Sequence, residues 1–386
     1  MAKIALVYFN AGGGHRAAAL ALQSLMREQQ RPWEVELVNL FEVLDPQGLF
    51  RKVMGFAPED FYNKRLRHGW TLGLAQELKL LQGAIRMGHA TLVRHLAPHW
   101  QRSAPDLVVS LVPNFNRALF ASVEAARPGT PFVTVMTDLA DLPPNFWVEP
   151  GQAQHVVCGT PRAAAQAFAM DYAASQVHLV SGMILRPDFY RPLVADRTAE
   201  RRALGLDAET PVGVVLFGGQ GSTVMRSIAK ALADRPLILL CGHNERLADT
   251  LRALPASAPH VVVGYTSEVA RYMRLGDYFV GKPGPGSMSE ALHSGLPVIV
   301  TRNAWTMPQE RYNTDWVHEQ GVGLVLRSFG PIARAVDQLV ADLPALRANV
   351  NRLDNRAVFE VVDVFAALLA GRAPSPARRG TVTTAS

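Results

Sequence analysis

The feature that most constrains this chain is a repeated order of strand, glycine turn and helix. Its clearest instance is the stretch GKPGPGSMSEALHSGLP at residues 281–297, which lies between apolar runs at 277–280 and 298–300. The glycines remove side chains from the start of the expected helix, so backbone N–H groups and the positive end of the helix dipole can face an anion. The stretch therefore predicts an anion-binding turn at the end of a buried strand.

The same alternation runs through the chain and predicts an α/β protein with parallel sheets covered on both faces. Strands are expected in the first half at residues 4–9, 34–40, 107–111, 132–137, 155–158 and 177–180. Strands are expected in the second half at residues 212–217, 237–241, 260–264, 278–280, 298–301 and 323–326. Helical patterns at 332–341 and 345–369 follow them. The pattern indicates two Rossmann-like domains in succession.

A length of 386 residues also favours two domains, each with its own core. We expect an N-terminal domain over residues 1–194 and a second domain over 195–330. Closing helices are expected over 331–370. The tail 371–386, rich in Pro, Arg, Ser and Thr, is expected to be disordered.

The sequence also indicates the cellular location of the protein. The first residues lack the basic region of a signal peptide, and no apolar run reaches about 18 residues, the length that spans a bilayer. The cysteines, Cys158 and Cys241, form no disulfide framework. We therefore expect a cytoplasmic protein. No Asp-x-Asp triad and no His/Cys cluster with ligand spacing is present, so no metal cofactor is expected.

The positive charge is concentrated in one segment. Residues 51–102 carry nine Lys or Arg against three acids, in a chain of net charge +6. Their apolar residues recur at helical spacing, and Trp70 and Trp100 border them, as in helices that lie in a membrane interface. The alternative is an ordinary packed helix with a solvated basic face. No nucleic-acid-binding motif occurs, so an anionic membrane surface is the expected partner.

The first glycine loop follows the first expected strand and contains Gly12, Gly13, Gly14 and His15. The imidazole of His15 could take a proton from an acceptor hydroxyl, because the ordinary pKa of histidine is near neutral pH. The alternative is a tight turn in which His15 caps a helix. The loop is not G-x-G-x-x-G and no acid ends the second strand, which disfavours a dinucleotide dehydrogenase.

A second glycine loop opens the second half of the chain. It consists of Gly218, Gly219, Gln220, Gly221 and Ser222. A diphosphate or a donor sugar could approach its backbone closely, and Ser222 could donate a hydrogen bond. The stretch is also explained as a glycine turn with Ser222 as the N-cap of the next helix, and the two interpretations can both hold.

The stretch 281–297 contributes Lys282, Gly284, Gly286, Ser287 and Glu290. Glu290 could hold a ribose diol while the backbone amides hold phosphate. A capping box formed by Ser287 and Glu290 is the alternative. Capping does not account for the lysine and the glycines, so ribose recognition is favoured.

Three further residues are candidates. Gln309 and Glu310 offer amide and carboxylate groups suited to sugar hydroxyls, unless they merely begin a solvated helix after Pro308. Asp138 follows a buried strand, where it could orient His15 or act as the base itself. It could equally be a loop or capping aspartate, and Asp141 competes for the same role.

Taken together, these motifs resemble the monogalactosyldiacylglycerol synthase family, which includes bacterial processive diacylglycerol glucosyltransferases and is related to the lipid-II-forming N-acetylglucosaminyltransferase. The resemblance covers roughly residues 4–326. It implies the GT-B architecture, in which two Rossmann-like domains face each other across a cleft and the last helix crosses back to the first domain. It also implies inverting transfer of a hexose from a UDP-sugar to a membrane-lipid hydroxyl, without a catalytic metal, at the inner face of the cell membrane.

The resemblance assigns roles to single residues. His15, with its glycine loop, is implied on the acceptor side, and Glu290 is implied as the ribose ligand. Gly286 and Ser287 resemble the diphosphate-binding turn, and Gln309 and Glu310 the sugar ligands. The galactolipid synthases carry a histidine-proline-x-tryptophan element, and this chain has DLPPNFW at residues 141–147 in its place. Their asparagine-valine-proline-tyrosine run is replaced here by NTDW at residues 313–316. The donor half thus matches more closely than the acceptor half.

Two other functions remain open from the residues alone. One is a UDP-sugar epimerase or hydrolase on the same scaffold, which would need several acids around the sugar. The other is a protein that binds a nucleotide sugar or a lipid without catalysis, which the combination of His15, Glu290 and Gln309 disfavours.

Overall fold

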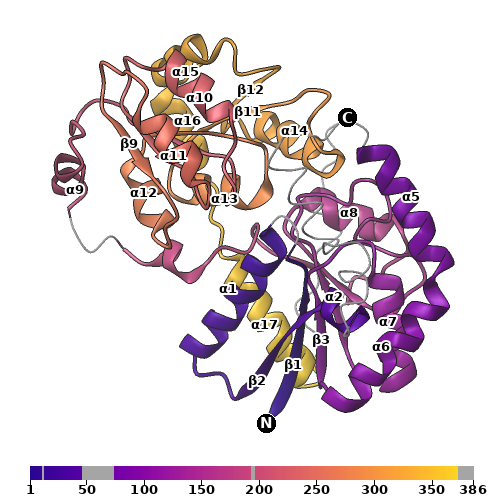
Figure 1. Cartoon of the computed structure of the whole chain (residues 1–386). Helices are drawn as coiled ribbons and strands as arrows, with labels where there is room; N and C mark the ends of the chain where they lie inside the picture. The colour runs from indigo at the N-terminus through magenta and orange to yellow at the C-terminus, as the bar shows by residue number, and fades with distance from the viewer. Residues whose placement is uncertain (11–12, 46–73, 193–195, 373–386) are drawn as a thin grey trace. The chain divides into compact units, whose positions relative to one another are not determined.

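The computed structural model describes residues 1–10, 13–45, 74–192 and 196–372 (Figure 1). Its described residues form two compact units. The first contains the chain up to Pro187 and the segment from Asn355 onward, and the second runs from Asp188 to Asp354. Three predicted features lie wholly or partly outside the described residues: Gly12, residues 51–73 of the basic segment, and residues 373–386 of the predicted tail 371–386.

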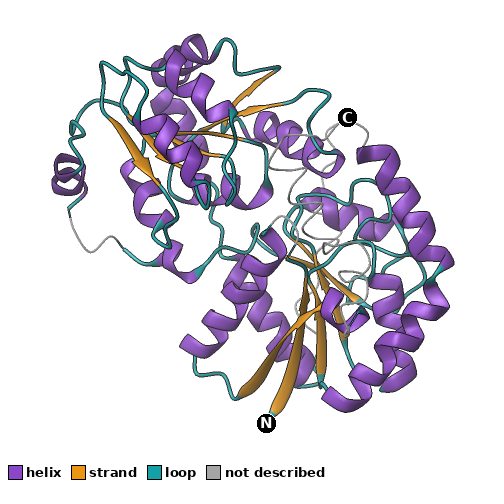
Figure 2. Ribbon diagram, viewed as in Figure 1, coloured by secondary structure: helices purple, strands orange, loops and turns teal. Residues whose placement is uncertain are grey.

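The first unit contains a six-stranded parallel sheet in the order β2-β1-β3-β4-β5-β6 (Figure 2). Its strands are β1 (Ala2–Tyr8), β2 (Trp33–Asn39), β3 (Leu107–Ser110), β4 (Phe132–Val135), β5 (His155–Cys158) and β6 (Val177–Leu179). Its helices are α1 (Gly14–Glu28), α2 (Leu40–Leu44), α5 (Leu74–Met87), α6 (His89–Ser103), α7 (Asn116–Ala126), α8 (Pro161–Ala169) and α17 (Ala357–Leu369).

Helices cover both faces of this sheet. Ala5 and Val7 of β1 belong to a core shared with Leu96 and Trp100 of α6, while α1 and α17 lie together on the other face (Figure 1). Trp100 is fully buried, and its indole N–H donates to Ser122 Oγ at 2.8 Å. The prediction that Trp100 borders a membrane-facing segment is therefore wrong, because α6 packs on α7 through this side chain.

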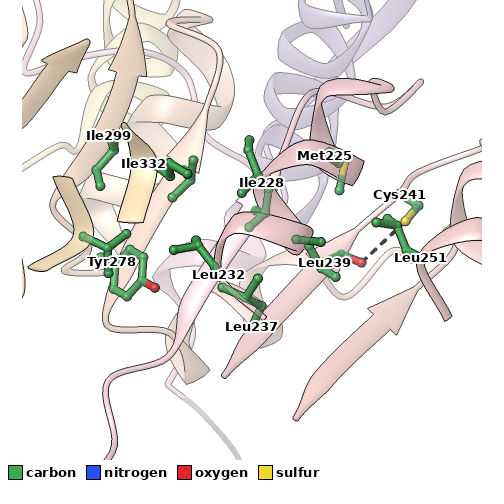
Figure 3. Packing of buried hydrophobic residues seen from close by; sticks show 14 of the residues in the cluster. Met225, Ile228, Leu232, Leu237, Leu239, Cys241, Leu251, Tyr278, Ile299 and Ile332 are labelled. Carbon is green, nitrogen blue, oxygen red and sulfur yellow. Dashed lines mark hydrogen bonds between the residues drawn. The ribbon is translucent and has the colours of Figure 1, made fainter. Parts of the chain in front are cut away.

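The second unit has a parallel sheet in the order β12-β11-β10-β7-β8-β9. Its strands are β7 (Gly213–Leu216), β8 (Leu237–Leu240), β9 (His260–Val263), β10 (Tyr278–Gly281), β11 (Val298–Thr301) and β12 (Gly323–Leu326). Its helices are η1 (Pro187–Tyr190, which begins one residue earlier), α9 (Arg197–Ala203), α10 (Val224–Ala231), α11 (Glu245–Arg252), α12 (Val269–Leu275), α13 (Pro285–His293), η2 (Pro308–Glu310), α14 (Arg311–Gln320), α15 (Ile332–Ala341) and α16 (Leu343–Val350). Side chains such as Ile228, Leu239 and Ile299 fill the core between sheet and helices (Figure 3).

The predicted α/β fold with two Rossmann-like sheets is confirmed, and each expected strand is present with ends shifted by at most two residues. The single helix expected at 345–369 is wrong. Two helices, α16 and α17, are separated by residues 351–356. Asn355 ends the interruption, because its Nδ2 donates to the Met183 carbonyl at 2.9 Å and its Oδ1 accepts from Ala357 N. The chain returns to the first unit at this point, so α17 crosses back to that unit.

Within the described ranges, none of the helices combines the length and the apolar character needed to cross a bilayer.

Candidate active site

In the second unit, two of the predicted glycine turns meet at one point of the sheet. Strands β7 and β10 pair in parallel, with Leu216 opposite Gly281. Strand order reverses between them, which is the place where open α/β sheets bind ligands, beyond the carboxyl ends of the strands. The loop from Gly218 to Ser222 follows β7, and the turn from Lys282 to Gly286 follows β10. Residues at least sixty positions apart thus contribute to one edge.

The first of these turns depends on glycine geometry. Gly218 adopts φ 76°, which favours glycine. The next strand end approaches so closely that a Cβ on Gly242 would lie 2.2 Å from the Gly219 carbonyl oxygen. That oxygen also accepts a hydrogen bond from His243 N at 2.9 Å. The loop is therefore held by the segment that follows β8, while Gly219 itself is exposed.

Ser222 is not the N-cap of the helix that follows. Helix α10 begins at Val224 with Thr223 as its N-cap and without a side-chain cap. The Ser222 hydroxyl instead accepts from Val224 N at 3.4 Å. The capping interpretation of Ser222 is wrong.

The second turn opens α13, whose N-cap is Gly284 and whose first residue is Pro285. No side-chain cap bonds to this helix, and Ser287 is already its third residue. The capping-box interpretation is therefore wrong, since Ser287 does not cap and Glu290 lies in the second turn. A Cβ placed on Gly286 would meet no atom within 4 Å. Gly286 is also exposed, and the helix dipole favours an anion at this end of α13.

Lys282 brings positive charge to the same turn. Its Nζ lies 3.2 Å from Glu310 Oε1, and a Cβ on Gly284 would lie 3.1 Å from Lys282 Cε. Glu310 is only 5% exposed, so it is the buried partner of this lysine. Neighbouring Gln309 is half-buried, and its amide lies 3.7 Å from Met307 Sδ. The two predicted sugar ligands, Gln309 and Glu310, therefore differ in their partners. The Glu310 carboxylate is paired with Lys282, whereas the Gln309 amide has no charged partner among the described residues.

Asn313 holds the turn between β10 and α13 in place through a buried hydrogen bond. It is fully buried in α14, and its Nδ2 donates to the Pro283 carbonyl at 2.7 Å. This bond ties η2 and α14 to the turn that precedes α13. The sequence contained Asn313 as part of a motif, but only the structure shows its positioning role.

Sequence reasoning missed an aromatic pair at the same sheet edge. Tyr265 follows β9, is 64% exposed and stacks on His243, with ring centroids 4.1 Å apart and an interplanar angle of 18°. Since His243 N bonds to Gly219, the pair is attached to the first glycine loop. The available signal was an aromatic residue directly after a strand end. An exposed, supported ring of this kind can stack on a planar ligand group.

In the first unit, His15 occupies the corresponding place. Strand order reverses between β1 and β3, and His15 is the second residue of α1, the helix that follows β1. Gly13 is the N-cap with φ 81°, so the histidine does not cap the helix. Gly14 begins the helix, and a Cβ on either glycine would meet no atom within 4 Å.

The His15 ring is held by polar and aromatic neighbours. Its Nδ1 lies 3.1 Å from Thr137 Oγ1, and its centroid lies 5.9 Å from the Trp147 ring. Burial among these groups lowers the pKa of His15 to about 4, although a hydrogen bond with the Leu111 backbone partly opposes the shift. The residue as a whole is half-buried. At neutral pH the imidazole is therefore uncharged and able to accept a proton.

The two candidate aspartates have different roles. Asp138 Oδ2 accepts from the Trp147 indole N–H at 2.9 Å, so Asp138 is linked to His15 through that tryptophan. Asp141 is fully buried and accepts from Trp147 N at 2.6 Å and Asn145 N at 3.0 Å. Burial raises the pKa of Asp141 to about 6, against the lowering effect of these amides. Asp141 thus shapes the loop and Asp138 remains the candidate near His15.

Sequence comparison finds no matching family model. The chain is 26% identical over 388 residues to the chloroplastic monogalactosyldiacylglycerol synthase 1 of Arabidopsis thaliana, covering 93% of this chain and 70% of that protein. It is also 26% identical to the chloroplastic monogalactosyldiacylglycerol synthase of Spinacia oleracea, covering 87% of this chain and 66% of that protein.

Solved structures share the fold at low sequence identity. MurG of Acinetobacter baumannii matches with a TM-score of 0.59 and 12% identity, over 95% of this chain and 99% of that one. The calicheamicin glycosyltransferase CalG4 matches with a TM-score of 0.61 and 17% identity, over 96% and 99%. The UDP-GlcNAc 2-epimerase of Neisseria meningitidis matches with a TM-score of 0.56 and 14% identity, over 94% and 99%. The structural matches show that the chain shares the GT-B fold with these proteins, and the sequence matches show that it is similar to the monogalactosyldiacylglycerol synthases.

Proposed function

We propose that this protein is an inverting hexosyltransferase that moves a sugar from a UDP-sugar to a hydroxyl of a diacylglycerol-like membrane lipid. The observation that carries the donor half is the uncapped start of α13 beside Lys282, at the switch point of the second sheet. The names of the sequence relatives support a glycolipid product.

The donor is proposed to lie along this sheet edge. Its diphosphate meets the amides of Gly286 and Ser287, and its ribose meets Glu290 one turn further along α13. Tyr265 stacks on the uracil, and Gln309 contacts the sugar. Lys282 adds a positive charge beside the diphosphate, so the site neutralises the leaving group with protein groups and needs no metal cofactor.

The proposed reaction is a single displacement. His15 or Asp138 takes the proton of the acceptor hydroxyl, and the oxygen attacks the anomeric carbon from the face opposite the diphosphate. The glycosidic bond to UDP breaks as the new bond forms. Charge that develops on the departing diphosphate is stabilised by the α13 amides and Lys282.

We further propose peripheral attachment to an anionic membrane, at the inner face of the cell membrane. Support comes from α5, where Leu80, Ala84 and Met87 form an exposed stripe at helical spacing, with Lys79 and Arg86 exposed beside it. Leu80 is 74% and Met87 86% exposed. A basic amphipathic helix with such a stripe is suited to a membrane interface.

The proposal is tested by incubating the protein with radiolabelled UDP-glucose, UDP-galactose, UDP-glucuronate or UDP-N-acetylglucosamine and total bacterial lipid, followed by lipid extraction. We expect label from one donor to enter the lipid fraction. Replacement of Glu290 by Gln should weaken UDP binding in calorimetry by about 1–3 kcal/mol, the value of a lost charged hydrogen bond. The exposed Glu209→Gln variant is the control. Unchanged UDP affinity in folded Glu290→Gln would remove Glu290 from the donor site.

An epimerase is the second candidate, because one structural relative is a UDP-GlcNAc 2-epimerase. Incubation of each UDP-sugar without lipid, followed by proton NMR, separates the two functions. A transferase leaves the donor sugar unchanged, whereas an epimerase converts it to its epimer.

A further inference from the structure

The Lys282 side chain lies across both glycine turns of the second unit. A Cβ placed on Gly284 would lie 3.1 Å from Lys282 Cε, and a Cβ placed on Gly218 would lie 3.8 Å from the same atom. Gly284 is the N-cap of α13, and Gly218 belongs to the loop that follows β7. The lysine stem therefore runs over the sheet edge at which the donor diphosphate is proposed to bind.

A carboxylate holds the ammonium of this lysine. Lys282 Nζ donates to Glu310 Oε1 at 3.2 Å, and within the described ranges each side chain is the other's sole ion-pair partner. The Glu310 carboxylate is buried, so water does not readily replace the lysine, and an unpaired charge in such a position is costly. Lys282 therefore leaves Glu310 only if a second anion attracts the ammonium and another hydrogen-bond donor reaches the carboxylate.

The backbone on both sides of the ion pair is fixed. Asn313 Nδ2 donates to the carbonyl of Pro283, the residue after Lys282, at 2.7 Å. Glu310 N donates to the Met307 carbonyl at 2.9 Å. Lysine has a flexible four-carbon stem, and the Lys282 side chain is 36% exposed. The ammonium can therefore change partner by rotation of its own stem, without movement of either turn.

A nucleotide sugar supplies both of the groups that such a change needs. Its diphosphate attracts an ammonium, and its sugar hydroxyls donate hydrogen bonds that a carboxylate accepts. We propose that Lys282 changes partner when the donor binds: its ammonium turns from Glu310 to the diphosphate, and the Glu310 carboxylate accepts from the sugar hydroxyls. This exchange rests on the proposed function, since it uses the donor site assigned there.

The exchange makes the site distinguish the donor from the product UDP. UDP attracts the lysine but leaves Glu310 without a hydrogen-bond donor, whereas a UDP-sugar supplies one. After transfer the sugar has left with the acceptor, so Lys282 returns to Glu310 and UDP is released. Glu310 is thus a specificity-determining residue that opposes the binding of UDP and favours the binding of the UDP-sugar.

The test uses calorimetry without acceptor, with UDP and with UDP-glucose, UDP-galactose, UDP-glucuronate and UDP-N-acetylglucosamine. The variants are Glu310→Gln, Lys282→Gln and the double variant. Glu200→Gln is the matched control, because Glu200 is a 15% exposed carboxylate of the same unit that is paired with Arg271 of α12. Thermal unfolding checks that each variant folds. Glu310→Gln alone tests the contribution of the sugar, so the test does not depend on the folding of Lys282→Gln.

In the wild type, at least one UDP-sugar should bind more tightly than UDP. Glu310→Gln should tighten UDP binding by about three- to fivefold, the scale of a half-exposed ion pair, and should remove the advantage of that UDP-sugar over UDP. The tightening should disappear when residue 282 is already Gln, because no lysine remains to be released. Glu200→Gln should change each affinity by less than about twofold.

The proposal is overturned if Glu310→Gln weakens UDP binding, since Glu310 then only positions Lys282. Equal tightening with and without Lys282 would also overturn it, because a simple charge effect gives that result, and so would an advantage of the UDP-sugar that persists in Glu310→Gln. In each of these cases UDP still binds the wild type, so the proposed donor site stands. A wild-type protein that binds neither UDP nor any of the UDP-sugars would instead refute the proposed function.

Discussion

At the scale of single residues, His15 differs from a free histidine because its surroundings disfavour the charged ring. Its pKa is lowered to about 4, so the unfolded chain binds a proton at this position between pH 6.5 and 4 that the folded chain does not. The neutral ring therefore costs stability as the pH falls through that window and costs nothing above it. The same neutrality keeps the imidazole available as a base at physiological pH.

If His15 is the base, its replacement by Ala should lower kcat by a factor of about 10²–10⁴, the usual contribution of general-base catalysis. UDP affinity should stay near the wild-type value, because the donor motifs belong to the other unit. In the wild type, kcat/KM should stay level from neutral pH to near pH 5 and fall as the ring becomes protonated. A variant that retains most of its rate would transfer the role to Asp138, and an acid limb centred at pH 6.5 would contradict the effect of burial.

At the scale of elements, the start of α13 is the part of the donor site that most depends on the absence of a side chain. Gly286 is a helical residue with open space beside it, so alanine there meets no protein atom. If the diphosphate of UDP occupies this space, a methyl group on residue 286 should interfere with UDP binding.

Gly286→Ala should therefore stabilise the folded protein by up to about 1 kcal/mol, as alanine does in place of helical glycine, while weakening UDP binding at least tenfold. Gly83→Ala in α5 is the matched control, since it is also a helical glycine with nothing within 4 Å of an added Cβ. Thermal unfolding and calorimetry give the two quantities. Equal UDP affinity in both variants would place the diphosphate elsewhere.

Helix α5 carries the second prediction at this scale. Replacing Leu80 and Met87 together by Gln should reduce sedimentation with phosphatidylglycerol vesicles, because each change removes exposed apolar surface from the stripe. Wild-type binding should also weaken as salt rises, since exposed charges are screened. Leu20→Gln, at a partly exposed leucine of α1, is the control. Undiminished binding in the double variant would indicate that α5 has only a solvated face.

At the scale of the whole molecule, local patterns predicted much of the fold because each strand, turn and helix has its own signature. The glycine turns and their sheet edge followed from residues close in sequence. Other contacts depend on topology, which no local pattern encodes. The Lys282–Glu310 pair, the packing of Trp147 on His15 and the Tyr265–His243 stack each require strand order. The break between α16 and α17 was missed because the apolar periodicity of both helices continues across it in the sequence.

That break determines how the chain closes the first unit. Asn355 is buried, donates to the Met183 carbonyl and accepts from the backbone N–H of Ala357, the first residue of α17. A Cβ on Gly182 would lie 2.8 Å from the Asn355 side chain. Ser181 bonds to Glu360 of the same helix. These contacts join two segments that are distant in sequence, so the first unit needs residues from both ends of the chain.

Replacing Asn355 by Ala should destabilise the first unit by about 1–3 kcal/mol, because it leaves the Met183 carbonyl unpaired in a buried position. Hydrogen exchange should then speed up in α17, in α1 and around residues 181–183, while β7, β10 and α13 keep their protection and UDP still binds. Asn351→Ala, at an exposed position four residues earlier, is the control and should change neither. Equal loss of protection in both units would show that they unfold as one, and an unaltered exchange pattern in α17 would show that Asn355 does not hold it.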